Sequence, residues 1–277
     1  MKSRQEIYDL VRRAQPAVLR APLAVADLVP LPHIVAVVPV YNHERAVPAV
    51  ASALRAHGLP LVLVDDGSDE ICRVALERLA RDLGASLVRR PVNGGKGAAV
   101  IAGLRKAREL GFSHALQVDA DGQHDLGDVP KFLDRARREP EAVICGRPLF
   151  DNSVPPVRFF SRYITHVLVW LQTLSFSKVR DSMCGFRLYP LRTVLDVVEH
   201  DGAGTRMDFD IEVLVKMAWR GHVLRWIDTR VSYPADGISH YRLLIDNLWL
   251  AGMHARLLIG MVWRAPVLLW RRIRRTA

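Results

Sequence analysis

Short apolar runs alternate with longer amphipathic segments along much of this chain. Most of the runs are four or five residues long and rich in Val, Leu and Ile, which is typical of buried strands. We predict strands over residues 34–38, 61–64, 86–89, 114–118 and 142–145, and helices over 46–57, 69–84, 98–110, 128–138 and 210–220. This alternation predicts an α/β fold with a mostly parallel central sheet flanked by helices.

Polar clusters follow three of the predicted strands. Residues 39–44 follow the first strand, 65–69 follow the second, and 119–124 follow the strand at 114–118. In parallel α/β sheets, ligands bind beyond the carboxyl ends of the strands, so we expect the clusters to converge on one crevice. A solvated turn explains any one cluster, but three together are less easily explained in that way.

The cluster after the strand at 114–118 contains ligands suited to a hard metal ion. Asp119 and Asp121 are two residues apart, so strand alternation presents both to one side. Two close carboxylates repel each other unless a cation lies between them or one is protonated. Carboxylate and amide oxygens without Cys suit Mg²⁺ or Mn²⁺ rather than zinc. The alternative is a solvated turn rich in Asp and Gly.

Composition and charge narrow the class of protein. Half of the 277 residues are apolar, which predicts one large globular domain or a domain with an appendage. The net charge of +10 indicates an anionic partner, which is a nucleic acid, a phosphorylated substrate or an acidic membrane surface. Cys72, Cys145 and Cys184 are far apart, which indicates a reducing compartment and disfavours a thiolate zinc site. No signal peptide is apparent, so we expect a cytoplasmic location.

The Gly-rich segment 93–97 differs from two common nucleotide-binding loops. It lacks the upstream Gly and the following Ser or Thr of a nucleoside-triphosphate loop, and no G-x-G-x-x-G follows the first strand. A nicotinamide-dependent dehydrogenase is therefore disfavoured. Lys96, ahead of a predicted helix, either helps to bind a diphosphate or is a solvated loop lysine.

The two ends of the chain differ from its middle. Residues 1–32 are expected to form a helical appendage. Residues 243–270 are rich in Leu, Met and Trp, but Arg256 and Arg264 would each cost about 2.5–3.5 kcal/mol at the centre of a spanning helix. We expect residues 241–277 to form basic amphipathic helices at an anionic membrane surface. The alternative is a pair of core helices with a solvated basic tail.

Four motifs together resemble those of family 2 glycosyltransferases. They are residues 35–42, 64–68, 93–98 and 119–124, which occur in the order and spacing of that family. Over residues 33–240 the chain is most similar to dolichol- and polyprenyl-phosphate sugar transferases. The resemblance implies a GT-A fold with a Rossmann-like sheet, a UDP- or GDP-sugar donor, and Mg²⁺ or Mn²⁺ as cofactor.

The resemblance also implies roles for single residues. It assigns Pro39, Tyr41 and Glu44 to the nucleotide pocket, Asp65 and Asp66 to the base or ribose, Asp119 to the nucleotide and the metal, and Asp121 and Gln123 to the metal. Residues 146–147 resemble a Gly-x-Arg phosphate contact, and residues 181–187 resemble a loop near sugar and acceptor. The Glu-Asp pair that supplies a base in many hydroxyl-directed relatives is not evident, and the nearest segment is 206–212.

The acceptor decides whether the reaction needs a base. An acceptor phosphate has a second pKa of about 6, so near neutrality it needs only cationic groups to hold it, for which the candidates are Arg147, Arg187 and Arg242. A hydroxyl acceptor needs a general base, for which the candidates are Asp208 and Asp210. Alternatively, Arg187 is structural, and the two acids only cap the helix at 210–220.

We therefore expect an inverting, metal-dependent transferase at the cytoplasmic membrane face, which moves a sugar to polyprenyl phosphate. Its expected catalytic residues are Asp121, Arg147, Arg187 and Asp210. The alternative acceptor is a lipid or saccharide hydroxyl. A catalytically dead scaffold and a nucleic-acid-binding protein are alternatives from other classes. Nucleic acid is not the expected partner, because the basic residues concentrate in the tail beside Trp and Leu.

Overall fold

The computed structural model describes residues 31–150, 156–175, 179–232 and 243–274. Residues Pro32–Ala277 form one compact unit. Nearly all of the helical appendage expected over residues 1–32 lies outside the described residues, as does the candidate Arg242.

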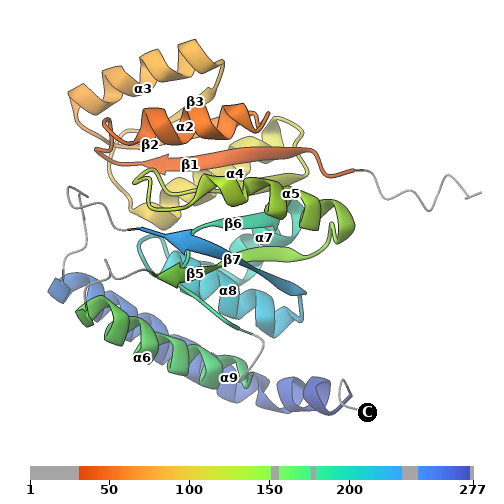
Figure 1. The fold of residues 1–277 in the computed structure, drawn as a ribbon. Helices are drawn as coiled ribbons and strands as arrows, with labels where there is room; N and C mark the ends of the chain where they lie inside the picture. Colours follow the sequence, from red (N-terminus) through yellow and green to blue (C-terminus); the bar gives the residue numbers. More distant parts are fainter. Residues whose placement is uncertain (1–30, 151–155, 176–178, 233–242, 275–277) are drawn as a thin grey trace, which may run out of the picture. The chain divides into compact units, whose positions relative to one another are not determined.

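A seven-stranded sheet organises the larger unit (Figure 1). Its strand order is β3-β2-β1-β4-β6-β5-β7, and every neighbouring pair is parallel except the two that involve β6. Six strands therefore run in one direction, and their carboxyl ends share one edge. The strands are β1 Ile34–Val40, β2 Leu61–Asp66, β3 Ser86–Arg90, β4 His114–Gln117, β5 Val143–Phe150, β6 Arg187–Pro190 and β7 Leu224–Val231.

Helices cover both faces of the sheet, as side-chain alternation requires. In β1, Val35 and Val37 join the core under α4, α7 and α8, whereas Ala36 and Val38 join the core under α2, α3 and α5. All four side chains are fully buried, which is why this strand is apolar throughout. The helices are α2 Val47–Ala56, α3 Glu70–Leu83, α4 Lys96–Glu109, the short 3₁₀ turn Leu126–Asp128, α5 Val129–Arg138, α6 Pro156–Thr173, α7 Leu191–Asp201, α8 Phe209–Arg220 and α9 Leu243–Arg274.

The C-terminal segment is one long helix, whereas we expected more than one. Helix α9 runs beside α6 and buries Met253 and Leu257 (Figure 1). Pro266 lies inside it at an exposed position, so water can bond the carbonyl group that the missing N–H leaves free. Among the helices of the described ranges, none has the combination of length and apolar content that crossing a bilayer requires.

Within the described residues, the structure confirms the mostly parallel α/β sheet, the five predicted strands and the five helices predicted between residues 46 and 220, and it adds α6, α7, β6, β7 and the short 3₁₀ turn, which we did not predict. Strand β6 has only four residues and begins with Arg187, whose charge conceals a buried position. Strand β7 buries Ile227, Thr229 and Val231 between exposed, mostly charged residues. Its pattern becomes recognisable only when its partner β5 is known.

Candidate active site

The turns that follow β1 and β2 are bonded to each other. Asn42 has a positive φ of 51°, which Asn tolerates better than most residues. Its N–H donates to Ser68 Oγ at 3.1 Å, and its Oδ1 accepts the N–H of Asp69 at 2.9 Å. Three expected nucleotide contacts, all half-buried, lie at this double turn or next to it: Pro39, Tyr41 and Glu44.

Asp66 holds the Gly-rich segment against the end of β2. Its carboxylate accepts the N–H groups of Gly94 at 3.1 Å and Gly95 at 2.8 Å, and it is ion-paired with Arg90. Burial raises the pKa of Asp66, and the two amides and Arg90 offset part of that rise. Asp66 thus positions the loop that leads into α4.

Asp65 is an internal anchor in this structure. Its side chain is almost completely buried and accepts the N–H of Ser68 at 2.9 Å. Its second oxygen lies 3.4 Å from Nε of Arg89. A contact from Asp65 to base or ribose therefore stays a prediction.

Lys96 joins three parts of the chain at the first residue of α4. Its Nζ lies 2.8 Å from the carboxylate of Asp119, which follows β4, and 2.9 Å from Oδ2 of Asp210 in α8. Burial lowers the pKa of Lys96, but the two carboxylates outweigh it and hold the pKa above its ordinary value. Lys96 is therefore an ion-paired residue here, not a solvated loop lysine.

Asp119 has a second side-chain neighbour. Nε2 of His124 lies 3.5 Å from its Oδ2. Burial raises the pKa of Asp119, but Lys96 and His124 outweigh this effect and hold it well below its usual range. The carboxylate at the end of β4 is thus kept ionised.

Glycines allow two loops to approach this ion pair closely. A Cβ on Gly185 would lie 2.6 Å from both Lys96 Nζ and Asp119 Oδ2. A Cβ on Gly97 would lie 2.5 Å from the carbonyl oxygen of Gly204. Larger side chains at either position would displace the loops before β6 and α8, so the site depends on these glycines.

Asp121 differs from its neighbours because no cationic side chain within the described ranges forms an ion pair with it. Its Oδ1 accepts the N–H of Gln123 at 3.0 Å. Burial and the charge of Asp119 raise the pKa of Asp121, and the Gln123 amide offsets part of the rise. Asp121 therefore has no direct ion-pair partner in the described ranges, although the charge of Lys96 offsets part of the rise in its pKa.

Asp210 is fully engaged in this structure. Its Oδ1 accepts a hydrogen bond from Nε2 of the buried Gln117 at 3.0 Å, while its Oδ2 pairs with Lys96. Asp208 precedes the helix, but its side chain accepts the N–H of Arg206 and makes no cap of α8. Neither acid therefore caps α8 with a side-chain hydrogen bond, which was the alternative interpretation.

The two candidate phosphate contacts that the structure describes lie in different surroundings. Arg147 is at the surface of β5, and its guanidinium makes a two-point pair with Asp228 on β7, with Nε 2.6 Å from Oδ1. Arg187 is fully buried and donates to the carbonyl oxygens of Asp210 at 2.6 Å and Ser182 at 2.8 Å. The geometry thus favours the structural role for Arg187, because its guanidinium is turned to backbone carbonyls inside the protein.

Residues 35–189, more than half of the chain, match the model of the family named Glycosyl transferase family 2. The chain belongs to this family. It is a glycosyltransferase.

Several relatives of this glycosyltransferase carry functional names. An undecaprenyl-phosphate mannosyltransferase from Micrococcus luteus is 27% identical over 63% of this chain and 75% of its own. A dolichyl-phosphate beta-glucosyltransferase from Trichomonas vaginalis is 29% identical over 65% of this chain, which spans only 59% of that relative. An uncharacterized glycosyltransferase from Mycobacterium bovis is 31% identical over 73% of this chain and 85% of its own.

Solved structures confirm the GT-A-like fold. Glucosyl-3-phosphoglycerate synthase from Mycobacterium tuberculosis, crystallised with phosphoglyceric acid, matches with a TM-score of 0.60 over 84% of this chain and 80% of its own. A further crystal structure of that enzyme contains Mn²⁺, UDP-glucose and phosphoglyceric acid. Sequence identity is only 14% and 16%, so this likeness concerns the fold alone.

The residues of this glycosyltransferase fit a divalent cation. Asp121 is a half-buried carboxylate that forms no ion pair with a cationic side chain of the described ranges, and Asp119 acts on it electrostatically. Within those same ranges, no group of three or more His, Cys, Asp or Glu residues is arranged to hold a metal. A cation on Asp119, Asp121 and Gln123 would therefore complete its coordination with oxygens of a bound ligand or water.

Sequence reasoning missed two residues of the site. Gln117 orients Asp210, and Arg90 neutralises Asp66. One signal was present, because Gln117 is a polar residue within an apolar run. The partner of Arg90 comes from a distant part of the chain, so no local pattern indicates it. Gly185, which lies against Lys96, belongs to the loop at 181–187 that the family resemblance places near sugar and acceptor.

We predict that Lys96→Met lowers the free energy of unfolding by about 3–5 kcal/mol, because it leaves the carboxylates of Asp119 and Asp210 without their cation. Urea unfolding at pH 7 with a chelator present measures this. The matched control is Lys106→Met, which removes an exposed pair with Glu109 and should cost about 0–1 kcal/mol. Equal losses for the two variants would contradict the role of Lys96.

Proposed function

We propose that this family 2 glycosyltransferase is an inverting, metal-dependent enzyme that moves a sugar from a nucleotide-diphosphate sugar to a polyprenyl phosphate at the cytoplasmic face of a membrane. The observation that carries the proposal is the acidic pair Asp119 and Asp121, at the carboxyl end of β4, in which Asp121 lacks a cationic partner among the described residues. Such a pair suits a divalent cation that neutralises a departing diphosphate.

The donor site would be built from the ends of β1, β2 and β4. Pro39, Tyr41 and Glu44 would line the nucleotide pocket, with Asp65 and Asp66 fixing the turn beside it. Lys96 would contribute positive charge near the diphosphate. The bound Mg²⁺ or Mn²⁺ would supply charge neutralisation of the leaving group. A UDP-glucose and Mn²⁺ complex of a protein with the same fold supports this assignment of donor class.

The acceptor would be a phosphate rather than a hydroxyl. A hydroxyl acceptor requires a general base that it can reach, but Asp208 and Asp210 are both buried, and both carboxylate oxygens of Asp210 are already bonded, by Gln117 and by Lys96. A phosphate acceptor is already ionised near neutrality and requires only positive charge to hold it. Relatives named for dolichyl phosphate and undecaprenyl phosphate support this choice.

Arg147 is the described residue best suited to hold the acceptor phosphate. It lies toward the carboxyl half of β5, and its fork-shaped guanidinium already makes a two-point pair with a carboxylate, Asp228. The same planar donors suit a phosphate. Arg242, outside the described residues, stays a candidate from the sequence. Arg187 would not contact the acceptor, and would instead position the backbone of Ser182 and Asp210 by its hydrogen bonds to their carbonyl oxygens.

Helix α9 would contact the membrane with its outer face. Among the described residues, its exposed large apolar side chains are Leu248, Trp249, Ile259, Val262, Trp263, Val267, Leu269, Trp270 and Ile273. Most of them lie on the side of the helix opposite Met253 and Leu257, which pack inward, whereas Trp249 and Val267 lie nearer to that packed side. Arg274 lies over the ring of the exposed Trp270, with its guanidinium carbon 4.1 Å from the ring centre, and this combination suits the headgroup layer of an anionic leaflet.

The donor prediction is tested by thermal-shift screening of UDP, GDP and their sugars, with and without Mn²⁺ or Mg²⁺. We expect one nucleotide to raise the melting temperature only when metal is present, because ligand at about 100 times its Kd adds about 2.7 kcal/mol of stability. Asp121→Asn should abolish this shift. Asp82→Asn, which alters an exposed pair with Arg78, is the control and should retain it. No shift with any nucleotide would contradict the proposal.

The acceptor prediction compares polyprenyl phosphate with the corresponding polyprenol. Asp208→Asn and Asp210→Asn should keep turnover of polyprenyl phosphate within about tenfold of the wild type, because no general base is needed. The pH profile of both variants should keep the wild-type acid limb, which the second ionisation of the phosphate sets near pH 6. A fall of about 10²–10⁴-fold together with loss of that limb would instead identify a base and a hydroxyl acceptor.

Vesicle flotation tests the membrane contact. Replacing Trp263, which is 81% exposed, and Ile259 by Ser should weaken binding to vesicles containing phosphatidylglycerol by at least about tenfold, because burial of each large apolar side chain contributes about 1.5–3 kcal/mol. The control replaces Ile71 and Val92, both 72% exposed and outside α9, by Ser. Equal binding of the two double variants would contradict contact through α9.

A further inference from the structure

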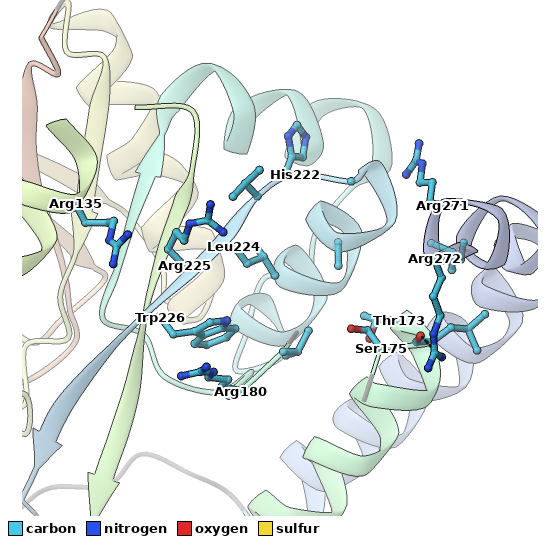
Figure 2. Close-up of a pocket in the computed structure, with 16 residues that line it drawn as sticks. Arg135, Thr173, Ser175, Arg180, His222, Leu224, Arg225, Trp226, Arg271 and Arg272 are labelled. Atoms are coloured by element: carbon cyan, nitrogen blue, oxygen red, sulfur yellow. Dashed lines mark hydrogen bonds between the residues drawn. The ribbon is translucent and has the colours of Figure 1, made fainter. Parts of the chain in front are cut away.

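An arginine-lined cavity lies away from the acidic site. It encloses about 790 Å³ between the end of α6, the end of α8, the beginning of β7 and the last turns of α9 (Figure 2). Leu224 begins β7 and pairs in parallel register with Val143 at the start of β5. The cavity therefore opens at the amino ends of these strands, whereas Asp119 and Asp121 follow the carboxyl end of β4. The two sites lie at opposite edges of the sheet.

The charge of this cavity is strongly positive. Five arginines and His222 are among its 16 lining residues, and no Asp or Glu is. Figure 2 shows Arg135, Arg180 and Arg225 on the side of the sheet, and Arg271 and Arg272 on α9. Glu139 pairs with Arg135 at 2.8 Å and with Arg225 at 2.6 Å, and so offsets one of the five charges.

Several arginine N–H groups in the cavity are not used by the hydrogen bonds that these side chains make. Arg271 donates to the carbonyl oxygen of Trp219 at 2.6 Å, and Arg272 donates to that of Leu174 at 3.4 Å. A guanidinium has five N–H donors, so the contact of Arg271 leaves others available to a ligand. Arg180 is exposed and makes no ion pair with an acid of the described ranges.

The cavity also contains a buried hydroxyl group without a hydrogen-bond partner. Oγ of Ser175, another lining residue, is buried and has no hydrogen-bond partner among the described residues. A buried polar atom without a partner costs free energy, which a bound acceptor or donor would recover. A hydroxyl beside arginines suits an anionic oxygen, because both donate hydrogen bonds to it.

We propose that this cavity, which we call the arginine cavity, binds a phosphate-bearing ligand. Planar guanidinium groups match phosphate oxygens in pairs, and charge-assisted hydrogen bonds of this kind are the strong ones. The volume exceeds that of a single phosphate, and Trp226, Leu224 and Leu268 offer apolar surface for an attached organic group. A lipid headgroup and a soluble phosphoester share this chemistry. The site does not depend on the transferase reaction, because it uses none of the residues assigned to that reaction.

The test measures binding of inorganic pyrophosphate by isothermal titration, with all divalent cations chelated so that no metal bridges an anion to the acidic site. Arg180→Gln together with Arg272→Gln should weaken binding by at least about tenfold, since a hydrogen bond to a charged group contributes about 1.5–3 kcal/mol. The control has the same loss of charge elsewhere, Arg78→Gln with Arg105→Gln on the exposed surfaces of α3 and α4, and should bind as the wild type does.

Two further variants exclude unfolding and a general charge effect. Arg180→Gln alone removes an exposed side chain, so it should weaken binding without lowering the melting temperature. Ser175→Ala changes no charge, and it should still weaken binding several-fold. Equal weakening in the test and control pairs, or no pyrophosphate binding by the wild type, would overturn the proposal.

A second probe identifies the source of the phosphate. Dihexanoyl phosphatidic acid, used below the concentration at which it forms micelles, carries a lipid phosphate without a membrane. Tighter binding of this probe than of pyrophosphate, lost in the Arg180 and Arg272 double variant, supports a lipid headgroup. Tighter binding of pyrophosphate, lost in the same variant, supports a soluble phosphoester. Retention of both probes by the double variant would overturn the site.

Discussion

The ammonium group of Lys96 is the charge on which the candidate active site depends. A parallel sheet gathers the acids that follow its strands at one edge, where their charges repel. Lys96 lies between Asp119 and Asp210, and it joins the start of α4 to the end of β4 and the first turn of α8. Without a cation at this point, the carboxylate that follows β4 and the carboxylate in the first turn of α8 would not lie close together. Asp121 forms no ion pair with a described residue, so its carboxylate would suit a bound cation.

Backbone amides and glycines, together with the ion pairs, hold the loops of the candidate active site in place. Asp66 binds the amides of Gly94 and Gly95, which fixes the loop from which Lys96 extends. Gly185 then brings the loop before β6 into contact with Lys96. Each interaction determines where the next one can form. The functional side chains are therefore held by a connected network, and most of them contact protein atoms as well as any ligand they would bind.

The charges of the protein are separated between the two edges of its sheet. Carboxylates collect where β1, β2 and β4 end, whereas arginines line the cavity where β7 begins. The net charge of +10 is consequently not spread evenly. Interactions between exposed charges fade over about 8–10 Å at physiological ionic strength, so the two edges can attract different ligands. A cation suits one edge and a phosphate suits the other.

The sequence by itself determined the α/β class, most of the elements and the acidic clusters, because strand burial and strand ends leave a local signature in apolar runs and the residues that follow them. It did not determine β6, in which Arg187 occupies a buried position, or the pairing of Asp210 with Lys96 across more than a hundred residues. Only the tertiary structure decided that Arg187 binds backbone carbonyls and that Arg271 and Arg272 meet Arg180 around one cavity. The physical reason is that burial and charge pairing depend on neighbours in space, which no local pattern of residues records.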